Sequence, residues 1–150
     1  MDIGAGNSYP ANALSNFSPH PFTLDGIDIA SMEGFLQSLK FKNPEMQKHV
    51  CTLVGRAAKF KGKTKKWWES GKLYWLSKEI DRFSEEYQEL LDKAYSAMTE
   101  HSDSFRRALI ATGNSVLTHN IGKNDPKRTI LTISEFTKRL TEIRTQLQRK

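Results

Sequence analysis

The sequence has little sulfur chemistry to offer, because Cys51 is the single cysteine among 150 residues. One thiol forms no internal disulfide and supplies no multi-cysteine metal site, so we expect a reducing compartment. The four histidines show no metal-ligand spacing with that cysteine, and no phosphate-cradling glycine-rich loop is present. The sequence therefore predicts no metal ion and no other cofactor.

Long hydrophobic runs are also missing. No apolar stretch approaches the roughly 20 residues that a membrane-spanning helix needs, and the chain does not open with a basic segment followed by an apolar one, as a secretion signal does. We therefore expect a cytoplasmic protein without a membrane partner. With only 5 prolines and 9 glycines, collagen-like and low-complexity classes are excluded, and 8 Phe, 4 Tyr and 3 Trp favour a folded chain. The length predicts one domain over residues 1–150.

Acidic residues are absent from the segment 56–66, which makes the charge distribution uneven. The net charge is +6, and six basic residues of this segment account for all of the excess. Trp67 and Trp68 follow at once. A basic patch beside aromatic rings suggests an anionic partner with a flat ring, such as nucleic acid or a nucleotide diphosphate. The alternative is a solvated lysine loop that aids solubility.

Apolar spacing predicts a helix-rich α+β fold with a small β-hairpin near the N-terminus. Residues 1–13 have no apolar period and are expected to form an extended lead-in. The dipeptide at 25–26, Asp-Gly, is suited to the two positive φ angles of a tight turn between strands at 22–24 and 27–29.

Capping residues mark the first two helices. Ser31 is expected to cap a helix that ends near residue 41, and Asn43 followed by Pro44 to open a second helix that stops at Gly55. The segment 56–72 has no sustained period, so it is expected to be a loop with at most one helical turn. A short strand is expected at 73–76.

Three more helices follow from similar signals. Ser84 caps a helix with a long apolar stripe, and Ser102 begins another that Gly113 ends. Residues 114–129 are polar and expected to form a loop. Thr132 and Glu135 match a capping box at the start of the last helix.

Three polar residues of the first helix, Glu33, Gln37 and Lys40, share one face. At about 100° per residue they lie about 80° to 140° around the helix from Met32, on the shoulder of the apolar stripe. There a carboxylate, an amide and an amine could border a cleft. The alternative is that they are ordinary amphipathic residues, with Glu33 complementing the helix dipole.

Five short segments follow one another in a distinctive order: LSNFS at 14–18, PF at 21–22, LDG at 24–26, SME at 31–33 and QSLKF at 37–41. In order and spacing they resemble the start of the NADAR superfamily, whose best-known branch is the YbiA-like proteins. More loosely, residues 55–59 and 105–113 resemble the middle and late helices of that family. Two departures are visible. Gly34 stands where the family has a histidine, and residues 118–125 replace a late Asp and a Trp-Gly pair.

The resemblance implies a single compact YbiA-like domain that hydrolyses an N-glycosidic bond. Known branches act on a ribosylamine intermediate of riboflavin synthesis or release ADP-ribose from guanine bases. Such cleavage builds positive charge on the anomeric carbon and negative charge on the departing nitrogen. Glu33 suits the role of a carboxylate near the sugar, or of a general acid and base. Lys40, if deprotonated, could attack the opened sugar aldehyde and form a Schiff base, or it could hold a phosphate as a fixed charge.

The resemblance also implies substrate-binding side chains, each with a plainer alternative. The candidates are Ser15, Asn16, Phe17, Gln37, Arg56, Trp67, Trp68, His119, Asn120 and Asp125. The hydroxyl and amide of the first two would serve a ribose, or only a turn. The aromatic rings would stack on a purine, or only pack in the core. The last three lie in the late polar loop, where the family places another part of its site, although Asp125 could equally stabilise the turn before Pro126.

Residues and resemblance together predict an N-glycosidase that cleaves the bond between a ribose, as part of ADP-ribose, and a nucleobase such as guanine. The main alternative is a non-catalytic module that binds ADP-ribose, an NAD derivative or modified nucleic acid. A third is a plain nucleic-acid-binding domain that uses the lysine segment. The expected partner is a nucleotide-like small molecule or an ADP-ribosylated nucleic acid.

Overall fold

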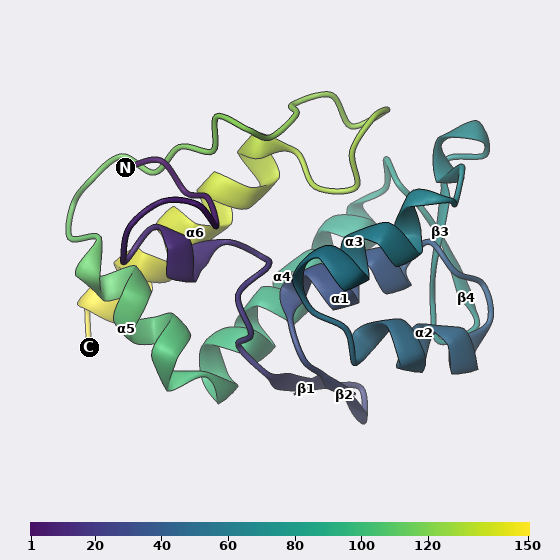
Figure 1. Ribbon diagram of the computed structural model, residues 1–150, viewed down its shortest axis with the longest axis horizontal. Coiled ribbons are helices and arrows are strands. Elements are labelled where there is room, and N and C mark those ends of the chain that lie inside the picture. Colours follow the sequence, from purple (N-terminus) through teal and green to yellow (C-terminus); the bar gives the residue numbers. More distant parts are fainter.

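The computed structural model describes all 150 residues and has helices as its main elements (Figure 1). In chain order the elements are the 3₁₀ turn η1 (Asn12–Leu14), strands β1 (Phe22–Leu24) and β2 (Ile27–Ile29), helices α1 (Met32–Ser38), α2 (Pro44–Cys51) and α3 (Gly55–Lys63), the 3₁₀ turn η2 (Trp67–Glu69), strands β3 (Lys72–Trp75) and β4 (Lys78–Asp81), and helices α4 (Glu85–His101), α5 (Asp103–Ala111) and α6 (Ile133–Gln148). The predicted helix-rich α+β fold with an N-terminal hairpin is confirmed.

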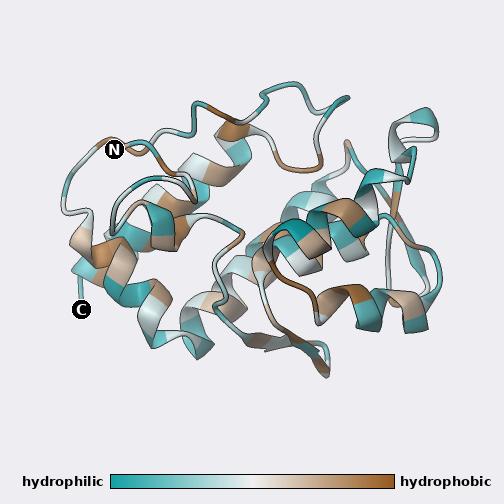
Figure 2. Ribbon diagram, viewed as in Figure 1, coloured by the Kyte–Doolittle hydropathy of each residue, from teal (hydrophilic) through white to brown (hydrophobic).

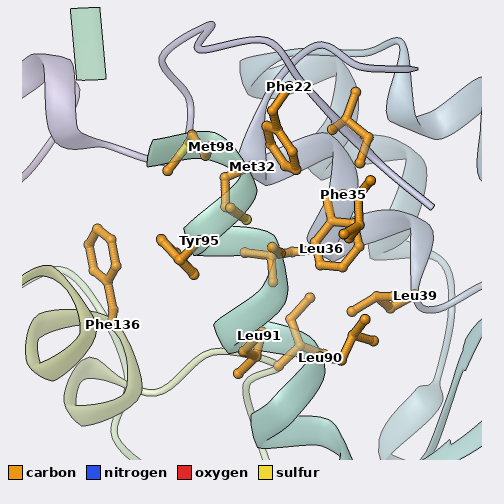
Figure 3. Close-up of a cluster of buried hydrophobic side chains, with 14 of the residues drawn as sticks. Phe22, Met32, Phe35, Leu36, Leu39, Leu90, Leu91, Tyr95, Met98 and Phe136 are labelled. Atoms are coloured by element: carbon orange, nitrogen blue, oxygen red, sulfur yellow. The ribbon is translucent and has the colours of Figure 1, made fainter. Parts of the chain in front are cut away.

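Helix α4 runs through the middle of the molecule. Figure 1 shows α1, α2, α3 and the β3–β4 hairpin at one end, and α5, α6 and both termini at the other. The apolar stripe of α4 packs between these two groups, as Figure 3 shows for Tyr95 and Leu91 between Phe136 of α6 and Leu36 of α1. The burial of this stripe joins the two ends of the fold into one hydrophobic core.

Both hairpins are antiparallel, but only the turn of the first one has residues typical of a tight turn. Asp25 and Gly26 have φ angles of 49° and 78°, and the predicted β1–β2 hairpin is confirmed. The strand predicted at 73–76 is also confirmed as β3. Its partner β4 was not predicted, because its turn places Leu76 and Ser77 at φ angles of 48° and 74° without a glycine or asparagine.

The predicted caps are confirmed. Ser31 accepts a hydrogen bond from the Gly34 amide at 3.1 Å, and Asn43 accepts from two amides of the first turn of α2. Thr132 and Glu135 form the capping box of α6. These contacts are local, so a few residues of sequence determine them.

The segment after α2 differs from the prediction. Helix α2 ends at Cys51, and Gly55, predicted to end it, instead begins α3 with a φ of 53°. The predicted loop therefore contains the nine-residue helix α3. Its buried side is only Ala58 and Gly62, which is too narrow and too small a stripe to produce a hydrophobic period.

The first residues are also more ordered than an unpaired lead-in. Asp2 forms a parallel bridge with Thr118, and the amide of Ile3 donates to the Thr118 carbonyl at 2.8 Å. Ile3 is fully buried. The N-terminus therefore fixes the start of the loop between α5 and α6, whose outer turn is hydrophilic (Figure 2).

Candidate active site

A cavity of about 400 Å³ opens between α1, α3 and the loop that joins α5 to α6. This volume is typical of a small-molecule site. It brings together eight of the predicted site residues, namely Ser15, Asn16, Phe17, Glu33, Gln37, Lys40, Trp67 and His119. They come from four separate parts of the chain, and the cavity is the feature that they share.

The polar face of α1 forms one wall of this pocket. Gln37 donates from Nε2 to Oε1 of Glu33 at 3.1 Å. Burial raises the pKa of the half-buried Glu33, although this hydrogen bond and nearby positive charges oppose it. Burial also lowers the pKa of Lys40, and the charge of Lys59 acts in the same direction, while Glu33 opposes both. Both pKa values are therefore shifted in the direction that favours the uncharged side chain.

Two glycines let neighbouring backbone approach α1. A Cβ on Gly62 would lie 1.9 Å from Oε1 of Gln37, so α3 crosses α1 at this point only because residue 62 has no side chain. A Cβ on Gly34 would lie 2.6 Å from the Leu53 carbonyl oxygen, and Gly34 does not line the pocket. Gly34, which stands where the family has a histidine, therefore faces neighbouring backbone and not the cavity.

Residues 15–17 are held against α1 and α4. The Asn16 carbonyl accepts from the Glu33 amide at 3.0 Å, and Oδ1 of Asn16 accepts from the Tyr95 hydroxyl at 2.9 Å. The side-chain nitrogen Nδ2 of Asn16 is thereby left free to donate into the pocket. Ser15 accepts from the Phe17 amide at 3.2 Å, which is a turn contact, and it also lines the cavity.

His119 reaches the pocket from the late loop. Its Nδ1 lies 2.8 Å from the Ile3 carbonyl oxygen, which can only accept, so Nδ1 carries the proton and Nε2 is an acceptor in the neutral ring. The ring packs edge-on against Phe136. A Cβ on Gly122 would lie 2.5 Å from the imidazole Cδ2, so a glycine is needed where the loop folds back over His119.

Buried contacts from Arg82, the residue after β4, and from α4 fix the other half of this loop. Arg82 donates from Nε to the Thr129 carbonyl at 3.0 Å and forms two hydrogen bonds with Glu135, at 3.0 and 2.7 Å. The Tyr87 hydroxyl donates to the Ile130 carbonyl. Burial raises the pKa of Glu135, but hydrogen bonds from Arg82 and other donors outweigh it and hold that pKa below its usual value. Thr129 and Ile130 line the pocket, so this network positions its wall.

Positive charge surrounds the cavity. Besides Lys40, its basic residues are Lys59, Lys63, Lys123 and Arg128, whereas Glu33 is the one carboxylate residue that lines it. These four basic residues were not among the predicted site residues. Lys59 and Lys63 were visible as part of the charged segment, but without α3 their side chains could not be assigned to a common face.

Four predicted residues lie outside the cavity: Arg56, Trp68, Asn120 and Asp125. Trp68 is 52% exposed and packs edge-on against Trp67. The backbone amide of Asn120 donates to Oδ1 of Asp2 at 2.8 Å. Asp125 accepts from the Lys127 amide at 3.0 Å and pairs with Arg128 at 3.8 Å, so its contacts are those of the plainer alternative, a turn.

The side chains that converge on the cavity suit an organic anion better than a metal ion. No group of three or more histidine, cysteine, aspartate or glutamate side chains is placed to hold a metal. Phe17 and Trp67 add ring surface to the positive lining.

None of the helices combines the length and apolarity needed to cross a membrane.

The fold is of the YbiA type. The NMR structure of the Escherichia coli protein YbiA matches with a TM-score of 0.63, over 98% of this chain and 83% of that chain, at 16% sequence identity. That similarity establishes the fold.

The family is established by two sequence matches. The family model for Bacteriophage protein GP30.3 matches residues 8–145. A relative from Enterobacteria phage T4, the "Uncharacterized 17.1 kDa protein in Gp30-rIII intergenic region", is 38% identical over 149 residues, which is 98% of both chains. The chain belongs to the bacteriophage GP30.3 family, which is of the NADAR type, and the predicted resemblance is confirmed.

Proposed function

We propose that this protein is an N-glycosidase that hydrolyses the bond between the ribose of an ADP-ribosyl group and a nucleobase such as guanine. The observation that carries the proposal is the presence of a half-buried carboxylate, Glu33, and an amine, Lys40, in one pocket whose other charged lining residues are all basic. In the reaction, water adds across the carbon–nitrogen bond. The anomeric carbon gains a hydroxyl group and the base nitrogen gains a hydrogen.

The positive lining supports a substrate that carries phosphates. Lys59 and Lys63 stand on α3, and Lys123 and Arg128 stand on the loop that contributes the facing wall. Lys59 and Lys63 both lack a salt bridge, so their charge is available to a diphosphate. The sugar and base would then lie deeper, near α1 and residues 15–17.

Glu33 is the proposed acid. Burial raises its pKa, which increases the fraction of protonated carboxyl that can give a proton to the departing nitrogen. Gln37 orients it through the 3.1 Å hydrogen bond. The free amide nitrogen of Asn16 would donate to a ribose oxygen, and Nε2 of His119 would accept from a hydroxyl group.

Lys40 is the proposed nucleophile, with a fixed phosphate-binding charge as its alternative role. Its lowered pKa increases the fraction of free amine at neutral pH. When the sugar ring opens, the bond from the anomeric carbon to the ring oxygen breaks, the ring oxygen takes a proton, and the base nitrogen forms a double bond to that carbon. The amine of Lys40 then adds to the anomeric carbon, the base leaves with a proton, and an imine to Lys40 remains. Water then hydrolyses the resulting imine, which restores the amine and leaves the sugar as an aldehyde that recloses.

We place this reaction in the cytoplasm, and we propose that nucleotide-like molecules or ADP-ribosylated nucleic acid supply the substrate. The test is incubation with ADP-ribosylated guanosine, ADP-ribosylated DNA, ribosylamine intermediates of riboflavin synthesis, and NAD, followed by chromatography of the products. We expect one adduct to lose its base-to-ribose bond. Tight binding without any product would instead support the non-catalytic binding module.

A further inference from the structure

The outer side of α3 and the segment after it carry positive charge that the pocket does not use. We call this region the α3 basic surface, and it consists of Arg56, Phe60, Lys61, Lys65, Lys66 and Trp68. All six residues are exposed, and none lines the cavity. Their location at the end of the molecule opposite to both termini is visible in Figure 1.

This charge has no acidic partner within the chain. None of the basic residues between 56 and 66 forms a salt bridge, although the protein has nine such pairs elsewhere. The whole net charge of +6 comes from these residues. Like charges one helical turn apart, such as Lys59 and Lys63, destabilise a helix slightly. A concentrated, unpaired charge of this kind complements a partner with repeated negative charges.

Two aromatic rings lie open within the same surface. Phe60 is 61% exposed and Trp68 is 52% exposed. The ammonium group of Lys63 lies 5.7 Å from the centre of the Phe60 ring. Exposed rings among cations stack on unpaired bases of any sequence, whereas the bases of a duplex are covered by their neighbours. The combination therefore fits a single strand.

The surface is continuous with the pocket. Arg56, Lys59 and Lys63 lie within about 60° of one another around α3 and span about 10.5 Å along it. Lys59 and Lys63 line the cavity, while Arg56 lies outside. Trp68 contacts Trp67, which also lines the cavity. A strand bound along α3 would thus pass the mouth of the pocket, where one of its bases could enter.

We propose that the α3 basic surface binds single-stranded nucleic acid and presents a modified base of that strand to the pocket. The first half of the proposal is independent of the reaction. The second half rests on the proposed function, because it takes the modified base to be the substrate.

The test measures fluorescence anisotropy with a labelled, unmodified oligothymidine of about 20 nucleotides at several salt concentrations. The surface variant combines Lys61→Gln, Lys65→Gln and Lys66→Gln. The matched control combines Lys138→Gln, Arg149→Gln and Lys150→Gln, which removes the same charge from exposed residues of α6 and the C-terminus. A melting curve checks the fold of each.

We expect the surface variant to bind at least about 10-fold more weakly, with a salt slope smaller by about 2, since each phosphate contact to a single strand contributes about 0.7. The control should bind like the wild type. Phe60→Ala should weaken binding without changing the salt slope. Equal weakening in both triple variants, unchanged binding in the surface variant, or stronger binding to phosphatidylserine vesicles than to the strand would overturn the proposal.

Hydrolysis separates this proposal from the proposed function. In the surface variant, turnover of ADP-ribosylated guanosine should stay unchanged, while turnover of the same adduct within a single strand falls. Loss of both activities to the same extent would overturn the presenting role. If the wild type hydrolyses neither substrate, the proposed function fails, and the anisotropy measurement still decides whether the surface binds a strand.

Discussion

Replacement of Glu33 by glutamine separates chemistry from folding. Glu33→Gln keeps the size of the side chain and removes its ability to exchange a proton. The new amide can still accept from Gln37 Nε2 through its oxygen, so the contact now measured at 3.1 Å persists. The helix cap at Ser31 and the packing of α1 are untouched. We therefore expect a folded protein that has lost its acid.

The size of the effect follows from the role. A positioned acid or base contributes about 10²- to 10⁴-fold, so turnover of the active substrate should fall by at least about 100-fold, which is about 2.7 kcal/mol in the barrier. The melting temperature should stay within a few degrees of the wild type. The measurements are product release by chromatography and a thermal melt. Glu142→Gln, on an exposed part of α6, is the control that should change neither.

The same variant tests the burial of the carboxylate. Because burial raises the pKa of Glu33, the folded state holds this proton more tightly than the unfolded chain does. The stabilisation is present at acid pH and is lost as the pH rises through the raised pKa. Glutamine does not ionise, so the melting temperature of Glu33→Gln relative to the wild type should increase from pH 4 to pH 7. Normal turnover, or a pH-independent difference in melting temperature, would refute this account of Glu33.

Three other substitutions test neighbouring contacts. Lys40→Arg keeps the charge but forms no imine, so activity should be lost. In the wild type, borohydride added during turnover should trap the sugar on Lys40. Near-normal activity of the variant, together with no trapped adduct in the wild type, would mean that Lys40 acts only as a fixed charge. Gly62→Ala should lower the melting temperature, because its Cβ would overlap Gln37, and an unchanged melt would contradict the close crossing. Arg82→Gln should cost about 3–5 kcal/mol in denaturant unfolding by stranding Glu135, and a cost below about 1 kcal/mol would contradict its role.

Much of the fold could be predicted because its signals are local. The caps at Ser31, Asn43 and Thr132 bond to amides two or three residues away, so a short stretch of sequence determines them. Helix α3 has no comparable signal. Only Ala58 and Gly62 are buried in this helix. Gly62 allows α3 to approach α1 closely, and the sequence alone does not reveal that approach.

The site was partly predictable for the same reason. Glu33, Gln37 and Lys40 share a face of one helix, and helical spacing was enough to group them. His119 enters through the bridge between Asp2 and Thr118, which joins residues more than 110 positions apart. The loop with Lys123 and Arg128 is likewise brought over α1 by contacts distant in sequence, such as those from Arg82. Periodicity carries no information about such pairings.

The proposed activity requires the pocket to break the bond between ADP-ribose and a nucleobase and not merely to bind the adduct. The direct measurement is a time course with ADP-ribosylated guanosine, in which ADP-ribose and guanosine are both quantified. We predict that the wild type releases them in equal amounts over many turnovers, while Glu33→Gln binds the adduct with similar affinity and releases neither. Binding of the adduct by the wild type without release of either product would contradict the claim.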